Sequence, residues 1–184
     1  MQAELVHRAR RGDREAFGVL AGGAVDRLYG IARLILRDAE LAEDATQDAL
    51  VRAWRDLPSL RDAERFDAWL YRLIVRACAD IGRHRRRYRA ALTIVRNEPA
   101  ELDRASELAD RDVIERGLRR LNDAQRSILV LTFYLGYSPG EAAEALEIPV
   151  GTAKSRLHYA TQALRAALAA DERSVSAARE GRSA

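Results

Sequence analysis

The chain has 184 residues, which allows one medium-sized domain or two small ones, and its charges almost cancel to a net charge of +3. Hydrophobic residues make up 48% and charged residues 32%, with only 11 glycines and 4 prolines, a composition that favours an all-α protein. The single cysteine, Cys78, excludes an internal disulfide and a cysteine-based zinc site, and we expect neither a metal nor a cofactor.

The first residues, MQAELVHRARRGD, contain no apolar stretch like that of a signal peptide. No window of the sequence approaches the roughly 20 apolar residues of a membrane span. We therefore expect a cytoplasmic protein without membrane insertion. Within this segment, residues 2–11 predict a short amphipathic helix, and Asp13 is placed to cap the helix that follows it.

A helix is predicted over residues 40–56, because Leu50, Trp54 and Leu57 fall on one apolar stripe. Pro58 ends this helix, and residues 57–65 are expected to form a loop.

A longer helix is predicted to start near Phe66, because apolar residues recur there at helical spacing. Its buried face is expected to hold Phe66, Trp69, Leu70, Leu73, Ile74, Ala77 and Ile81. Trp69 lies on this stripe and is expected in the core, whereas Tyr71 lies off it and is the better candidate for an exposed aromatic.

A change in composition then divides the chain. Residues 83–89 read RHRRRYR, whereas residues 98–112 hold six acidic residues against two arginines, a local charge of −4. Apolar periodicity fades between these two stretches and the next helix. We expect two small helical domains, over residues 1–89 and 113–170, joined by a flexible acidic linker over 90–112 and followed by a polar tail over 171–184.

The second domain contains a pattern typical of a helix-turn-helix. A helix is predicted over residues 121–135, packed through Leu121, Ile128, Leu129, Leu131 and either Tyr134 or Leu135. Gly136 can end that helix in a left-handed turn. Ser138 then fits an N-cap, Pro139 the first helical position, and Glu141 the reciprocal position of a capping box.

The next helix follows Pro149 and is expected to bury Ala153, Leu157, Ala160 and Leu164. Its other side presents the polar residues Thr152, Lys154, Ser155, Arg156, His158, Tyr159 and Gln162. Such a helix can enter a major groove and offer its early polar residues to base edges. The alternative is an ordinary helical hairpin with a solvated polar face.

Residues 121–165, LNDAQRSILVLTFYLGYSPGEAAEALEIPVGTAKSRLHYATQALR, resemble region 4 of bacterial sigma factors. This resemblance implies that the polar face described above binds the −35 promoter element, and that the segment also contacts the flap of the polymerase β subunit. Glu147 stands where the family usually has glycine. In a left-handed turn a non-glycine residue would cost about 1 kcal/mol.

Residues 43–55, EDATQDALVRAWR, resemble the sigma segment that grips the clamp helices of the polymerase β′ subunit. The residues implied in this contact share one helical face: Asp44, Gln47, Asp48 and Arg52. From the spacing alone, a solvated charged face explains the same pattern.

Residues 66–87, FDAWLYRLIVRACADIGRHRRR, resemble the adjoining sigma segment, which opens and reads the −10 element. Holding an unstacked strand needs positive charge along its backbone and a pocket for an extruded base. The candidates for this contact are Arg61, Tyr71, Arg72, Arg76, Asp80, Arg83 and Arg86. Many family members have asparagine at the position of Arg76, so base recognition here is expected to differ from the common pattern.

Together these matches identify the chain as similar to the extracytoplasmic-function (ECF) group of sigma factors. The implied partners are core RNA polymerase, promoter DNA and an anti-sigma factor. A standalone helix-turn-helix regulator is the alternative, although it leaves residues 43–55 unexplained. An enzyme is not expected, because the histidines at 7, 84 and 158 are scattered and no nucleophile–base pair is recognisable.

Overall fold

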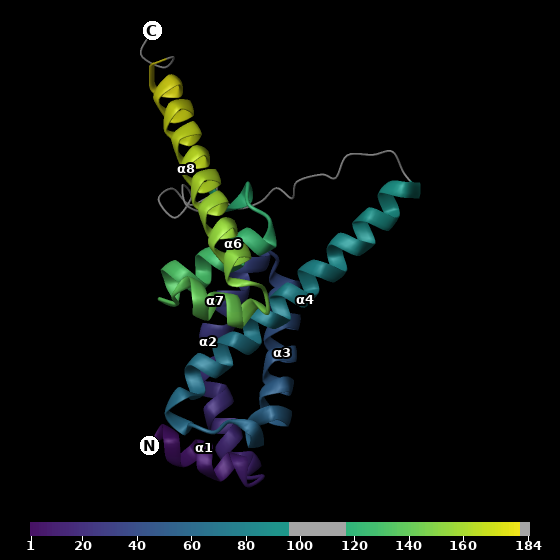
Figure 1. Cartoon of the computed structure of the whole chain (residues 1–184), viewed down its shortest axis with the longest axis vertical. Coiled ribbons are helices and arrows are strands. Elements are labelled where there is room, and N and C mark those ends of the chain that lie inside the picture. Colours follow the sequence, from purple (N-terminus) through teal and green to yellow (C-terminus); the bar gives the residue numbers. More distant parts are fainter. Residues whose placement is uncertain (96–116, 181–184) are drawn as a thin grey trace.

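The computed structural model describes residues 1–95 and 117–180, with side chains for residues 1–88 and 117–170. Within these ranges the regular elements are all helical, which confirms the expected all-α fold (Figure 1). The α-helices are α1 (Gln2–Arg10), α2 (Arg14–Leu36), α3 (Ala39–Asp56), α4 (Phe66–Val95), α6 (Asp123–Leu129), α7 (Pro139–Leu146) and α8 (Val150–Glu180). Shorter turns are η1 (Leu57–Ser59), η2 (Ala63–Arg65) and the π-helical η3 (Val130–Tyr134).

The predicted cap at Asp13 is confirmed. Its carboxylate accepts a hydrogen bond from the Ala16 backbone N–H at 3.0 Å and pairs with the Arg8 guanidinium at 2.7 Å. These hydrogen bonds, that from Ala16 first, hold the pKa of Asp13 below its usual range. Asp38 caps α3 in the same way through the Leu41 N–H, so two side-chain caps set the starts of α2 and α3.

The apolar stripe predicted from Leu50, Trp54 and Leu57 does not form the buried face of α3. Leu57 is fully buried, but Leu50 is half-buried and Trp54 is 37% exposed. The buried face of α3 consists instead of Ala42, Ala45, Thr46, Ala49 and Ala53. Alanines at these positions let α3 approach α2 and α4 closely, so the larger side chains lie along the edge of the contact.

Helix α4 begins at Phe66 as predicted. Trp69 is half-buried with its ring 6.0 Å from that of Phe66, whereas Tyr71, expected to be exposed, is half-buried against the core. The helix continues to Val95 and so includes residues 90–95, where the linker was expected to begin. The rest of the expected linker, residues 96–112, lies outside the described residues.

The helix predicted over residues 121–135 is divided into α6 and the π-helical turn η3. Asn122 caps α6 in a capping box with Gln125, which sequence reasoning did not identify. Leu135 packs against the core and Tyr134 is exposed, which settles the alternative left open between them. Gly136 has φ +72°, as expected of a residue that ends a helix in a left-handed turn.

The two halves of the described chain pack on each other. Figure 1 shows α7 beside α4, with which it is in contact, and α6 contacts both α2 and α4. Buried apolar residues from both halves form one continuous cluster. Helix α8 extends to Glu180, so residues 171–180 of the expected polar tail are helical, while residues 181–184 lie outside the described residues.

Candidate nucleic-acid and polymerase interfaces

The helix-turn-helix is formed by α7 and α8. The Ser138 hydroxyl accepts a hydrogen bond from the Glu141 N–H at 3.3 Å, and the Glu141 carboxylate accepts one from the Ser138 N–H at 2.8 Å. Pro139 occupies the first turn, so the predicted capping box is confirmed. Hydrogen bonds from the hydroxyl and then the N–H of Ser138 hold the pKa of Glu141 below its usual range.

The turn between α7 and α8 depends on Glu147. Its backbone is left-handed, with φ 53° and ψ 46°, and its N–H donates to the carbonyls at the end of α7. The following N–H, of Ile148, donates to the Ala143 carbonyl at 3.0 Å. Glycine adopts this backbone geometry without strain. A glutamate in the same geometry costs about 1 kcal/mol of folding free energy relative to glycine.

The polar face predicted for α8 is present. Its exposed residues are Thr152, Lys154, Ser155, His158, Tyr159 and Gln162. Ala153 and Ala160 are buried on the opposite side, and Leu157 and Leu164 are half-buried there. Arg156 differs from the other polar residues because it is half-buried; burial first, then the nearby Arg86 guanidinium, lowers its pKa.

The residues predicted for the −10 element do not form one free surface. Arg61 is exposed between η1 and η2, and Arg83 and Arg86 are exposed on α4. Asp80 forms ion pairs with Arg83 and, at 2.9 Å, with Arg52 of α3.

The other three members of that set are half-buried: Tyr71, Arg72 and Arg76. Arg76 faces α7. Its Nε donates to the Ala145 carbonyl at 3.2 Å, and its Nη1 lies 3.2 Å from the Glu147 carboxylate. The two positions that depart from the family pattern are therefore in direct contact.

The four residues predicted for the polymerase contact divide into two pairs. Asp44 and Gln47 are exposed, whereas Asp48 and Arg52 pair with each other at 2.6 Å. Because Arg52 also pairs with Asp80, it connects α3 to α4. Asp44 and Gln47 are thus available to a partner, while Asp48 and Arg52 also help to hold the domain together.

Comparisons with known proteins match two separate regions of the chain. Sigma-70 region 2 matches residues 24–90, and sigma-70 region 4 matches residues 111–164. ECF RNA polymerase sigma factor SigM of Mycobacterium tuberculosis is 35% identical over 154 residues, covering 84% of this chain and 78% of that protein. The chain belongs to the sigma-70 family, as an ECF sigma factor.

Other relatives cover nearly the whole chain. RNA polymerase sigma-H factor of Pseudomonas aeruginosa is 30% identical, covering 90% of this chain and 92% of that protein. The solved structure of CnrH in complex with the cytosolic domain of CnrY superimposes with a TM-score of 0.59 at 29% identity, covering 92% of this chain and 98% of that chain. The function of this sigma factor is promoter-specific transcription initiation with RNA polymerase, and the standalone regulator is not favoured. Among the described helices, none combines the length and apolar character needed to cross a membrane.

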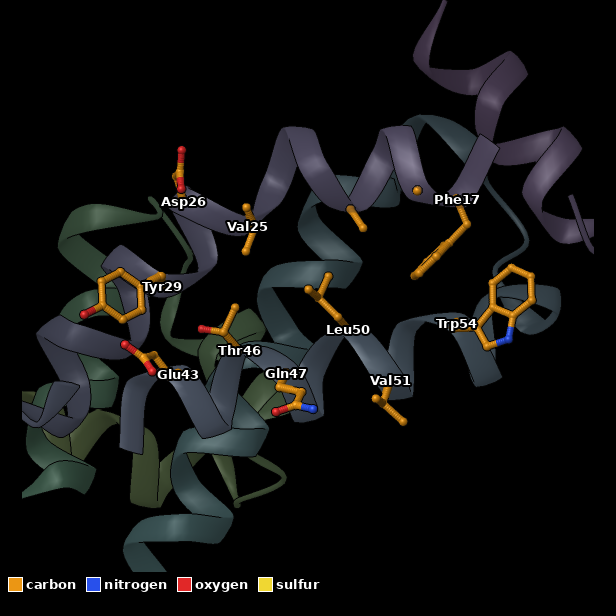
Figure 2. A pocket seen from close by; sticks show the side chains of 12 residues that line it. Phe17, Val25, Asp26, Tyr29, Glu43, Thr46, Gln47, Leu50, Val51 and Trp54 are labelled. Atoms are coloured by element: carbon orange, nitrogen blue, oxygen red, sulfur yellow. The ribbon is translucent and has the colours of Figure 1, made fainter. Parts of the chain in front are cut away.

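An apolar groove of about 820 Å³ runs between α2 and α3 of this sigma factor. Figure 2 shows Phe17 and Trp54 at one end of the groove, Leu50 along its floor, and Tyr29 beside Glu43 at the other end. Sequence reasoning missed this groove, because helical periodicity does not show which apolar residues of α3 a neighbouring helix covers. Gln47, one of the residues predicted to contact the polymerase, also lines the groove.

Sequence reasoning also missed Arg126, which is 5% exposed. Its guanidinium donates to the carbonyls of Ile35 on α2 and of Leu118 and Leu121, and it pairs with Asp123. Burial lowers the pKa of Arg126 to about 10, so the group remains charged at neutral pH. No local sequence pattern indicates that Arg126 connects α6 to α2, because Ile35 lies 91 positions away in the sequence.

Proposed function

We propose that this sigma factor docks on core polymerase through α3, reads the −35 element with α8, and opens the −10 element with α4 and the preceding loop. It acts in the cytoplasm and performs no covalent chemistry itself. The observation that supports the proposal best is the exposed polar face of α8, carried on a helix-turn-helix with the predicted capping box of α7 in place.

The −35 element is proposed to contact the first four turns of α8. Thr152 and Ser155 lie near the helix N-terminus, where a helix inserted in the major groove meets base edges. Lys154, the only lysine in the chain, is exposed and can neutralise a phosphate. Tyr159 and Gln162 follow on the exposed side and are assigned to the outer part of the site together with Arg156 and His158.

The −10 element is proposed to lie along α4. Arg83 and Arg86 are exposed and supply positive charge for the separated strand, and Arg61 is placed in the loop where the family holds its base pocket. Tyr71, Arg72, Arg76 and Asp80 keep their assignment to this site. Arg76 reaches the DNA only when α7 is no longer bound to it, since the two are now in contact.

The polymerase contact is proposed to combine charge and apolar surface. Asp44 and Gln47 present an exposed acidic and amide surface that suits a basic partner and sets the register of docking. The groove beside them adds exposed apolar area from Val51 and Trp54, which a partner helix could bury. On the C-terminal half, exposed Phe133 and Tyr134 offer apolar surface to the β flap.

An anti-sigma factor is proposed as a further partner. The support is the similarity to CnrH, whose structure was solved in complex with the cytosolic domain of CnrY. The exposed apolar groove is a surface that a free chain benefits from covering.

The −35 assignment is tested by comparing Lys154→Ala with Arg14→Ala, which removes an exposed arginine remote from α8. Holoenzyme binding to a promoter fragment is measured across a range of salt concentrations. We expect Lys154→Ala to reduce the slope of log K against log salt by about 0.9, and Arg14→Ala to leave it unchanged. Equal slopes for Lys154→Ala and the unmodified protein would show that Lys154 does not contact a phosphate of the promoter.

The polymerase assignment is tested by reversing the charge at Asp44, an exposed residue that forms no ion pair within the described part of the chain. Asp44→Lys should weaken binding to core polymerase, because it replaces an attraction to a basic surface by a repulsion. Glu4→Lys, at an exposed position on α1 that does not line the groove, is the matched control for net charge. If both variants weaken binding equally, only net charge matters and the assignment of Asp44 is wrong.

A further inference from the structure

Arg76 joins the two halves of the molecule. It lies on α4, and all three of its nitrogens meet the end of α7: Nε with the Ala145 carbonyl at 3.2 Å, Nη2 with the Glu144 carbonyl at 3.3 Å, and Nη1 with the Glu147 carboxylate at 3.2 Å. The last carbonyls of a helix lack partners within it and carry the negative end of its dipole. A guanidinium is suited to this position by charge and by its several donors.

Three further contacts hold the same arrangement at separate places. The Tyr137 hydroxyl donates to the Ala68 carbonyl near the start of α4 at 2.9 Å. Arg126 donates to the Ile35 carbonyl at the end of α2. At Gly82 on α4, an added Cβ would lie 2.8 Å from the Asp123 carboxylate, so α6 approaches α4 closely there. The contact between the halves is therefore extended and well fitted.

This closed arrangement is incompatible with simultaneous reading of both promoter elements. Their names place them about 25 base pairs apart, which at about 3.4 Å per base pair is roughly 85 Å. In the structure α7, which carries α8, rests directly on the helix assigned to the −10 element. Arg76, itself assigned to that element, is occupied by α7. One promoter cannot engage both surfaces until the halves separate.

We propose that Arg76 and Glu147 form a self-inhibitory clasp, which keeps the free chain closed until core polymerase separates its two halves. This inference rests on the proposed function. The 21 residues between Val95 and Gly117 can reach about 70 Å when extended, so separation needs no break in either half. The clasp also gives a reason for a strained glutamate in the turn, because glycine there could not bind Arg76.

The closed state is tested in the full chain by fluorescence energy transfer between dyes on Arg33→Cys in α2 and Ala166→Cys in α8, both exposed positions. Cys78 is fully buried and stays unlabelled. We expect high transfer in the free chain and a fall in transfer when core polymerase binds. Low transfer in the free chain, or unchanged high transfer in the bound complex, would overturn the clasp.

The contribution of the clasp is tested with Glu147→Gln and, as a second contact, Tyr137→Phe. When a closed form dominates, weakening it tightens binding of any partner that needs the open form. We expect core polymerase to bind about two- to five-fold more tightly with Glu147→Gln. With Tyr137→Phe the gain should be about two- to ten-fold.

Glu144→Gln is the matched control: it makes the same charge change on α7, but only the backbone of Glu144 contacts Arg76. It should leave the affinity unchanged. Unchanged affinity in both Glu147→Gln and Tyr137→Phe, or an equal gain in the control, would overturn the clasp. Failure of the unmodified chain to bind core polymerase would instead contradict the proposed function, and energy transfer in the free chain would still report whether it is closed.

Discussion

Replacing Arg126 by methionine tests how the two halves are held together. The Arg126 side chain is 7% exposed and its partner Asp123 is 15% exposed, so the ion pair between them is shielded from water. Arg126→Met leaves the Asp123 carboxylate without its partner and three carbonyls, of Ile35, Leu118 and Leu121, without this donor. The Ile35 carbonyl belongs to the last turn of α2, where no helical N–H is available to it.

Removing one member of a buried pair typically costs about 3–5 kcal/mol, and we expect Arg126→Met to lower the free energy of unfolding by that amount. Urea unfolding followed by far-UV circular dichroism measures the change. Arg126→Lys should cost less, because it keeps the charge but loses the forked geometry that reaches several acceptors.

Arg14→Met is the control, since replacing an exposed arginine should change stability by less than about 0.5 kcal/mol. If Arg126→Met is as mild as this control, the guanidinium is solvated and does not connect α2 to α6.

Two further predictions concern single groups. Because the folded-state pKa of Glu141 is lowered, its ionised form stabilises the fold above the ordinary carboxyl pKa, and this stabilisation is lost as pH falls through the lower folded value. The difference in free energy of unfolding between the unmodified protein and Glu141→Gln should therefore shrink as pH falls from about 6 to about 3. Urea titrations at several pH values measure this difference. A difference that stays constant with pH would show that the charge of Glu141 does not stabilise the cap. Burial raises the pKa of the Cys78 thiol to about 12, so a thiol reagent should label it only after denaturation; rapid labelling of the native protein would show that α4 opens.

The features that sequence predicted well are local. Asp13, Ser138 and Glu141 each act on a backbone N–H within three residues, so the order of residue types was enough to place the caps. The end of a helix at Gly136 follows from the same short-range logic. The polar face of α8 was also predictable, because helical periodicity alone divides it from the buried alanines.

The features that sequence missed depend on what lies opposite a residue in space. Trp54 has the periodicity of a core residue, but the alanines of α3 fill the contact with α2 and α4 and leave the indole at the edge of a groove. The spacing of Asp48 and Arg52 predicted a shared face correctly, but it could not show that Asp80 of α4 completes their ion-pair network.

The contact between the halves was beyond sequence reasoning for the same reason. Arg76 and Glu147 were each recognised as departures from the family pattern, but they lie in different domains and no local pattern pairs them. Only the packing of α7 on α4 brings the guanidinium to the end of α7. The two departures then explain each other, as an ion pair that the usual asparagine and glycine could not form.

As a sigma factor, this chain gives core RNA polymerase its promoter specificity. The most direct measurement is run-off transcription by core polymerase on a library of promoter fragments, with and without the purified chain. We predict transcripts from a defined subset of fragments that share −35 and −10 sequences, and only when the chain is present. Binding of the chain to DNA without polymerase, together with no chain-dependent transcript, would contradict the account and favour a standalone regulator.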